Sequence, residues 1–192
     1  VAIDSPAYDD FLASAIEVTV KQPPVAMLNT DIRNNFETAM KPLGEIAKLV
    51  AGSEQDPDVS RNQAACQLYV SKVSTFLENP SMRVEAFGPS SIILRAKNEQ
   101  EFMELANSLE GNLTASLHVG KGDSALVDQL LPILESKAGR VLWDGFPPGV
   151  MPTASTHHGG PWPAASDSRH TSIGLFGYRR FVRPVCRQGF PS

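Results

Sequence analysis

Apolar residues recur at helical spacing near the start of the chain. One stripe, with intervals of three and four residues, consists of Tyr8, Phe11, Leu12, Ala15, Ile16 and Thr19. Ser5 and Pro6 are typical of a helix start, and Pro23 with Pro24 breaks the pattern. The spacing therefore predicts a first helix over residues 6–21.

The same spacing continues up to a polar stretch. Thr30 is expected to cap a second helix, whose buried face carries Ile32, Phe36, Ala39 and Met40. Pro42 should interrupt that helix, and a short third helix should follow over residues 43–50. Residues 53–63 are polar and predict a surface loop. Residues 1–63 are therefore predicted to be mainly helical.

Short apolar runs alternate with helical patterns from residue 64 onward. Strands are predicted over residues 68–70, 91–96, 113–119 and 140–143. Between them the pattern predicts a helical turn at residues 72–78 and two helices, capped by Asn98 and Asp123. Strands joined through helices imply a mostly parallel sheet that is covered on both faces. The predicted fold is one three-layer α/β/α domain over residues 1–192, with residues 64–192 as its α/β part.

Composition narrows the class of protein. Of 192 residues, 42% are apolar and 20% are charged, which is typical of a soluble globular chain. Seventeen basic and twenty-one acidic residues give a net charge of −4, which argues against nucleic acid as a partner. The sequence contains no stretch of 18 apolar residues, so no membrane-spanning helix is predicted.

Charge is unevenly distributed along the chain. Residues 168–192 carry five arginines and no acidic residue, a local charge of +5 that leaves −9 on residues 1–167. This pattern favours a basic last element docked on an acidic body. A phosphate or carboxylate site is the alternative.

Two cysteines, Cys66 and Cys186, fit a reduced cytoplasmic protein better than a disulfide scaffold. Cys66 lies in a small apolar run, and no glycine-rich turn exposes Cys186, so neither is expected to be a nucleophile or to form a disulfide. The start at Val1, without an initiator Met or a signal peptide, resembles a cut inside a longer chain.

The longest predicted loop follows the last strand and holds His157, His158 and Trp162. Parallel sheets bind ligands at the carboxyl ends of their strands, and this loop leaves from such an end. A metal would need a third ligand, and no cysteine or carboxylate stands at a suitable spacing, so no metal is expected. The loop either lines a pocket, with Trp162 as an apolar wall, or is purely structural. Downstream, Asp167 and Ser168 are interpreted as caps of a helix over residues 171–182 rather than as parts of a hydrolytic triad.

A compact cluster precedes the strand at residue 91. Glu85, Phe87, Gly88 and Pro89 combine a carboxylate, an aromatic ring and a turn within five residues. Such a cluster can offer acceptors for sugar hydroxyls beside a stacking face. It can equally be an ordinary turn with Phe87 in the core, and spacing leaves both interpretations open.

Several segments, taken in order, resemble the aldehyde dehydrogenase superfamily. Glu85-x-Phe87-Gly88-Pro89 before an apolar strand resembles the family's Glu-x-Phe-Gly-Pro motif. Residues 109–116 (Leu-Glu-Gly-Asn-Leu-Thr-Ala-Ser) and residues 138–145 (Ala-Gly-Arg-Val-Leu-Trp-Asp-Gly) resemble two of its strands. Residues 158–169 and 180–191 are similar to the branch of NADP-preferring 2-oxoglutarate semialdehyde (2,5-dioxopentanoate) dehydrogenases and bacterial fatty-aldehyde dehydrogenases.

The resemblance covers residues 80–192 well and residues 1–79 loosely, and it implies a thiol mechanism. A cysteine thiolate attacks an aldehyde, hydride passes to a nicotinamide, and a glutamate base activates the water that releases the acid. In the family the cysteine and the base precede the motif by more residues than are present here. The resemblance therefore implies that this chain holds no catalytic residue, is truncated at both ends and is inactive alone.

The resemblance also implies a cofactor and its ligands. The cofactor is expected to be NADP, with NAD as the alternative, and Glu85 is expected to bind the nicotinamide-ribose hydroxyls with Phe87 packed nearby. The residues expected to line the substrate entrance are Phe146, His157, His158 and Trp162. Asp144 stands where the family usually has Asn, which keeps an acceptor and loses two donors.

The implied parent is a cytoplasmic homo-oligomer that acts on a small aldehyde such as 2-oxoglutarate semialdehyde, with no nucleic-acid or membrane partner. The alternative is a non-catalytic α/β binding domain that resembles the family. A cysteine encoded a few residues before Val1, after a glycine-rich stretch, would favour the enzyme.

Overall fold

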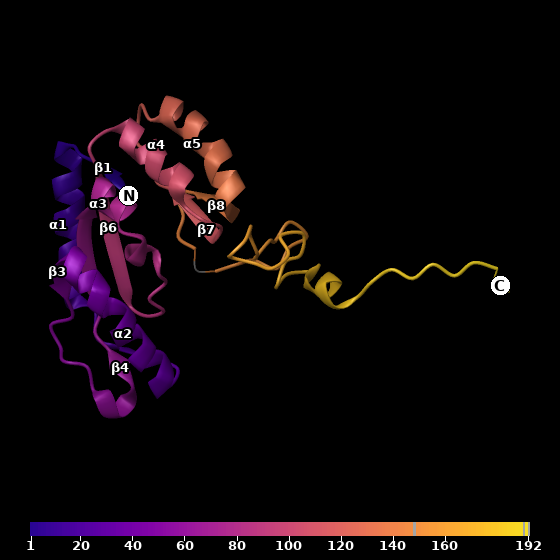
Figure 1. Cartoon of the computed structure of the whole chain (residues 1–192), viewed down its shortest axis with the longest axis horizontal. Coiled ribbons are helices and arrows are strands. Elements are labelled where there is room, and N and C mark those ends of the chain that lie inside the picture. Colours follow the sequence, from indigo (N-terminus) through magenta and orange to yellow (C-terminus); the bar gives the residue numbers. More distant parts are fainter. Residues whose placement is uncertain (148, 190, 192) are drawn as a thin grey trace. The chain divides into compact units, whose positions relative to one another are not determined.

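The computed structural model describes residues 1–147, 149–189 and 191, and it divides into two compact units (Figure 1). The first unit is Val1–Leu105 and the second is Ala106–Ser192. The single domain expected over residues 1–192 stays a prediction. Within the described residues, no helix is both long and apolar enough to span a membrane.

The first unit is built on a four-stranded sheet. Its strands, in the order in which they pair, are β1 (Ala2–Ile3), β6 (Ser90–Ala96), β5 (Gln67–Lys72) and β3 (Lys48–Gly52). β1, β6 and β5 run parallel, and only the edge strand β3 is antiparallel to its neighbour. The prediction of a mostly parallel sheet is therefore confirmed.

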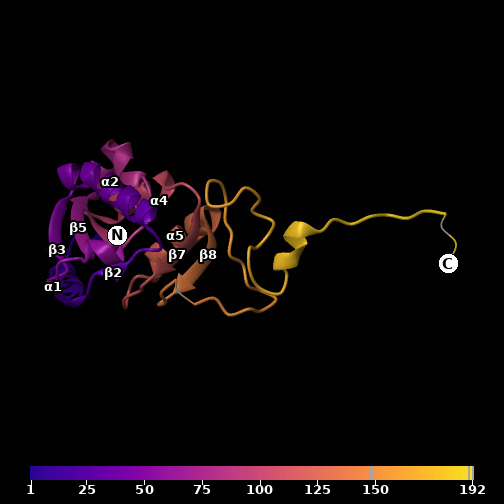
Figure 2. The ribbon, with the colours of Figure 1, turned by 90° about the horizontal axis from the view of Figure 1, so that it is seen from below.

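Helices cover both faces of this sheet (Figure 2). On one face α1 (Pro6–Lys21) packs its residue Tyr8 against Leu68 and Ile93, which are 5% and 8% exposed. Toward the other face, the hydroxyl of Tyr69 lies close to Gly44 in α2 (Thr30–Ile46). The short helix α3 (Val73–Glu78) contacts β5 and β6. Successive side chains of a strand point to opposite faces of the sheet, and the neighbouring residues Leu68 and Tyr69 of β5 are both buried. Both faces of the sheet are therefore covered at β5.

The start of α2 differs from the prediction. The cap is Asn29 rather than Thr30, because the Asn29 side chain accepts a hydrogen bond from the backbone N–H of Ile32 at 2.9 Å. The Thr30 hydroxyl instead donates to the side-chain oxygen of Asn62 at 2.9 Å. This bond ties the helix start to the loop that the sequence predicted at residues 53–63.

The predicted break at Pro42 and the third helix over residues 43–50 are wrong. α2 continues through Pro42 to Ile46, because its face with Phe36 and Met40 is buried and outweighs the roughly 3 kcal/mol cost of an internal proline. The residues that follow form β3 and pair with β5. The remaining short elements are β2 (Val25–Ala26), β4 (Gln63–Ala64), and the 3₁₀ turns η1 (Val59–Arg61) and η2 (Pro80–Arg83).

The second unit contains one βαβ crossover. β7 (Asn112–Leu117) and β8 (Ala138–Trp143) are parallel, with α5 (Ser124–Lys137) packed against β8 (Figure 1). α4 (Glu99–Ser108) leads into this unit and is capped as predicted, because Asn98 accepts from the N–H of Glu101 at 2.9 Å. Asp123 is the N-cap residue of α5, as predicted, but its side chain makes no capping bond to the helix: its carboxylate accepts from the N–H of Gly120 at 2.8 Å.

The helix predicted over residues 171–182 is also wrong, because only the 3₁₀ turn η3 (Gly177–Phe181) forms there. Thr171 is 7% exposed, and its hydroxyl donates to the carbonyl of Ile173 at 2.7 Å. The same oxygen accepts from the N–H of His158 at 2.8 Å. These bonds hold a turn at the residue where the helix was expected to begin.

Candidate functional site

In the first unit, a fixed turn joins η2 to β6 and carries Glu85 and Phe87. At the start of the turn, Met82 is buried, with 7% of its surface exposed, and the N–H of Val84 donates to the carbonyl of Ser81 at 3.4 Å. At the end of the turn, the carbonyl of Pro89 accepts from the N–H of Gln67, the first residue of β5, at 2.9 Å. The turn is therefore anchored at both ends, at the amino end of β6.

Gly88 closes this turn against the core. A Cβ placed on Gly88 would lie 2.6 and 2.7 Å from the ring atoms Cγ and Cε2 of Phe36. Phe36 is 2% exposed at the centre of α2, so its ring is confined. Carbon atoms in contact prefer about 3.5–4.0 Å, so glycine is the residue that fits this position.

Glu85 and Phe87 project from the anchored turn into open space. Phe87 is 68% exposed, so the interpretation that places Phe87 in the core is wrong. Glu85 is exposed, and within the described residues its carboxylate has no hydrogen-bond or ion-pair partner. The turn is therefore held without Glu85, and it presents two acceptor oxygens two residues before an exposed aromatic ring.

In the second unit, the carboxyl ends of β7 and β8 are joined through Asp144. Asp144 has a positive φ of 46°, its N–H donates to the carbonyl of Leu117 at 2.8 Å, and its Oδ1 accepts from the N–H of Val119 at 3.0 Å. The bond to Val119 needs only an acceptor, so Asp serves there as well as Asn. Phe146 lies at this end with its ring centroid 5.1 Å from that of His118, and is 79% exposed.

The loop then returns to the amino ends of the same two strands. The N–H of Gly111, just before β7, donates to the carbonyl of Trp162 at 3.2 Å. A Cβ on Gly139, at the start of β8, would clash with the backbone of Gly159. A six-residue strand is about 20 Å long, so Phe146 and Trp162 lie at opposite ends of the strand pair.

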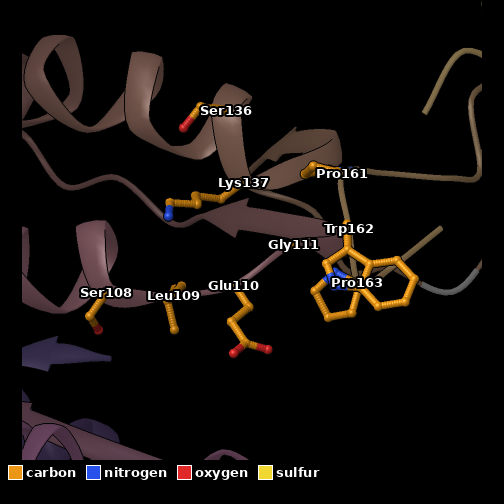
Figure 3. A pocket seen from close by; sticks show the side chains of 9 residues that line it. All are labelled: Ser108, Leu109, Glu110, Gly111, Ser136, Lys137, Pro161, Trp162 and Pro163. Atoms are coloured by element: carbon orange, nitrogen blue, oxygen red, sulfur yellow. The ribbon is translucent and has the colours of Figure 1, made fainter. Parts of the chain in front are cut away.

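The strand pair therefore does not bring together the four residues expected at the substrate entrance. Trp162 borders a cavity of about 430 Å³, together with Pro161, Pro163, Glu110 and Lys137 (Figure 3). The indole and the Pro163 ring lie side by side in this view, and Trp162 is 79% exposed. Trp162 thus borders a pocket, as one interpretation of the loop expected, but this pocket lies at the amino ends of β7 and β8 and not at the carboxyl ends where a ligand was expected.

Glu110 and Lys137 were not predicted from the sequence. Glu110 stands just before β7 and Lys137 just before β8, and the parallel pairing of the two strands places both at one cavity. The only signal in the sequence is that each precedes a predicted strand. Amino ends of neighbouring parallel strands meet at one edge of a sheet.

The two histidines have different surroundings. His157 lines a second cavity of about 200 Å³. His158 is tied by its backbone, since its carbonyl accepts from both the N–H and the hydroxyl of Ser172 at 3.0 and 2.9 Å. Its ring atom Nδ1 is buried, and within the described residues it has no hydrogen-bond partner.

Asp167 forms a side-chain fork instead of the predicted helix cap. Its two carboxylate oxygens accept from Nε and Nη2 of Arg169 at 3.0 and 2.8 Å. This hydrogen bonding to Arg169 holds the pKa of Asp167 well below its usual range. Ser168 does not start a helix, because none begins at residue 171.

Two known relatives match the chain along almost all of its length. Alpha-ketoglutaric semialdehyde dehydrogenase 2 of Azospirillum brasilense is 38% identical over 195 residues, covering 100% of this chain and 37% of that protein. Alpha-ketoglutaric semialdehyde dehydrogenase of Acinetobacter baylyi is 37% identical over 190 residues, covering 98% of this chain and 36% of that protein. The chain belongs to the aldehyde dehydrogenase superfamily. It spans little more than a third of the length of these relatives.

Solved aldehyde dehydrogenase structures share the fold. Indole-3-acetaldehyde dehydrogenase of P. syringae, in complex with NAD⁺ and IAA, has a TM-score of 0.67 and 19% identity, covering 93% of this chain and 36% of its own. Betaine aldehyde dehydrogenase of Staphylococcus aureus, in complex with NAD⁺, has a TM-score of 0.65 and 19% identity, covering 99% and 40%. No family model matches the chain. The family inferred from the sequence motifs is confirmed, and so is its mixed α/β fold.

The two cysteines of this family member lie in different surroundings. Cys66 is partly buried, with its sulfur 3.8 Å from the carbonyl of Pro23, and Cys186 is exposed after η3. Both are free thiols. Among residues 1–147, 149–189 and 191, no three His, Cys, Asp or Glu side chains come together as a metal site would need.

Proposed function

We propose that the chain is part of an NAD(P)-dependent aldehyde dehydrogenase that oxidises an aldehyde to a carboxylic acid. The observation that carries this proposal is the anchored turn that presents Glu85 and Phe87. The relatives with 38% and 37% identity support it, because both are named for oxidation of an aldehyde. The alternative is a non-catalytic α/β binding domain that resembles the family, and the activity of the complete protein distinguishes the two.

The exposed turn fits a nicotinamide nucleotide. The two oxygens of the unpartnered Glu85 carboxylate suit the adjacent hydroxyls of a ribose, and Phe87 offers an apolar ring within two residues. The cofactor, when bound, accepts a hydride from the substrate. Glu85 binds and orients it, and the Gly88–Phe36 contact keeps Glu85 in place. Orientation of reacting groups is worth several kcal/mol of a barrier, so this role affects turnover as well as binding.

Three further assignments belong to this proposal. The nucleophilic cysteine and the general base are supplied by residues outside this chain, since Cys66 and Cys186 lack suitable surroundings. Phe146, His157, His158 and Trp162 stay assigned to the substrate entrance, although within this chain they occupy separate places along one loop, with Phe146 at the carboxyl ends of β7 and β8 and Trp162 at their amino ends. The cofactor is NADP in preference to NAD, the substrate is 2-oxoglutarate semialdehyde or a similar aldehyde, and the enzyme is a cytoplasmic homo-oligomer.

The complete product of the gene that contains this chain tests the proposal. Incubation with 2-oxoglutarate semialdehyde and NADP⁺, or NAD⁺ in a parallel arm, should produce the reduced nucleotide at 340 nm and 2-oxoglutarate in equal amounts. The 192-residue chain alone should produce neither. An inactive complete protein, tested with a range of aldehydes and both cofactors, would contradict the proposal, and turnover by the chain alone would show that the nucleophile was misplaced.

A further inference from the structure

The smaller cavity of the second unit, of about 200 Å³, is lined by a concentration of basic side chains. Arg169, Arg179, His157 and His170 all border it. The role proposed above uses only His157 of these four. The size suits a small organic acid or a phosphate, since pockets for drug-sized ligands occupy about 300–1,000 Å³.

Two loop segments that are distant in sequence build the walls of this cavity. The N–H of His158 donates to the buried Thr171 hydroxyl, and Ser172 donates twice to the carbonyl of His158. Gly159 fits between them, because a Cβ there would lie 3.0 Å from both Nε2 of His157 and the carbonyl oxygen of His170. The cavity is therefore preformed by hydrogen bonds and close backbone contact.

The two arginines are held in place, yet both keep donors free. Arg169 uses Nε and Nη2 on Asp167, and a guanidinium carries five N–H donors in all, so three remain. Arg179 lies over the ring of Phe176, with its guanidinium carbon 4.1 Å from the ring centroid. Stacking of this kind occupies the face of the guanidinium and leaves the donors in its plane available.

The charges around the cavity do not balance. Asp167 compensates Arg169 and also lies 3.8 Å from Nε2 of His170. Arg179 has no carboxylate partner within the described residues. With both histidines neutral, the cavity therefore carries a net positive charge, which attracts an anion.

We propose that this cavity binds the carboxylate group of a small 2-oxo acid, with Arg179 as its main ligand and Arg169 as the second. Paired N–H groups of a guanidinium match the two oxygens of a carboxylate. The choice of a 2-oxo acid rests on the proposed function, whose substrate and product each carry such a group. Inorganic phosphate shares the same recognition chemistry and is the competing source.

Calorimetric titration of the 192-residue chain with 2-oxoglutarate, and separately with inorganic phosphate, tests this site. Arg179→Gln should weaken 2-oxoglutarate binding by at least about tenfold. Arg180→Gln is the matched control, because it removes the same charge from the neighbouring residue, which does not line the cavity, and it should change binding by less than about twofold. Arg179→Lys keeps the charge but loses the paired donors, and should fall between them.

Unfolding curves of each variant show whether the fold is retained. If Arg179→Gln does not fold, Arg179→Lys carries the comparison. Equal effects of the substitutions at Arg179 and Arg180, no saturable binding of 2-oxoglutarate, or binding of phosphate alone would overturn the proposal. If the chain does not bind 2-oxoglutarate but the complete protein oxidises aldehydes, this binding site is refuted and the proposed dehydrogenase function stands. If the chain binds 2-oxoglutarate but the complete protein is inactive, the dehydrogenase function is refuted, and the cavity is a 2-oxo acid site that is no longer connected to a substrate.

Discussion

Replacing Gly88 with alanine tests how the turn that carries Glu85 and Phe87 is fixed. The added Cβ would lie 2.6 and 2.7 Å from Cγ and Cε2 of Phe36, so the ring or the turn must move by about 1 Å to reach an ordinary carbon contact. Phe36 is 2% exposed, so its ring is enclosed by the core. Overpacking of this kind costs about 1–3 kcal/mol of unfolding free energy. For a chain of this size each kcal/mol lowers the Tm by roughly 2–4 °C.

Thermal and urea unfolding followed by circular dichroism measure this effect. Gly44→Ala is the matched control, because its Cβ would lie 3.9 Å from the Tyr69 hydroxyl and it removes a glycine from a helix interior. That change should be neutral or stabilise the chain by up to about 1 kcal/mol. Phe36→Leu should make room, so the double variant with Gly88→Ala should lose less stability than the two single losses combined. Wild-type stability of Gly88→Ala, or strict additivity in the double variant, would refute the contact.

Three further predictions concern other parts of the chain. The Tyr8 hydroxyl is buried without a hydrogen-bond partner among the described residues, so Tyr8→Phe should leave the urea midpoint unchanged or raise stability by up to about 2 kcal/mol, and a clear loss would show a missed partner. Hydrogen bonds from Arg169 lower the pKa of Asp167, so the ionised carboxylate stabilises the fold above its unfolded pKa of about 3.9, and this stabilisation is lost as the pH falls below that value. Asp167→Asn should therefore make the decrease of Tm below about pH 4 less steep. An unchanged decrease would contradict the ion pair. In the complete protein, changing both Cys66 and Cys186 to Ser should keep turnover within about tenfold, and a far larger loss with intact folding would identify one of them as the nucleophile.

The spacing of apolar residues predicted the helices and strands whose signal lies within the segment itself. The helix over the apolar stripe (α1) and the strands over the apolar runs (β5 and β6) formed where expected. β3 was mistaken for helix because Leu43, Ile46 and Val50 continue the helical spacing, while its pairing with β5 is a long-range contact. The helix expected from Thr171 was lost to hydrogen bonds with His158, thirteen residues earlier.

In the candidate site, too, local motifs located some residues, whereas long-range packing decided how they are arranged. The motif located Glu85 and Phe87, but only the packing of Gly88 on Phe36 showed that the turn is held without them. Glu110 and Lys137 meet through the pairing of β7 with β8, which no local pattern encodes. The separation of Phe146 from Trp162 arises from a loop that crosses back over the strand pair, and sequence proximity concealed it.

The most direct test of the account is Glu85→Gln in the complete protein, with turnover and Tm measured on one preparation. Hydrogen bonds to a charged acceptor are worth about 1.5–3 kcal/mol, so kcat/KM for the cofactor should fall by roughly 10–100-fold. The Tm should stay unchanged, because Glu85 is exposed and its carboxylate has no hydrogen-bond or ion-pair partner among the described residues. Glu45→Gln, an exposed carboxylate in α2, should change neither. A lower Tm with unchanged kinetics of the folded enzyme would contradict the account and make Glu85 a structural residue of the turn.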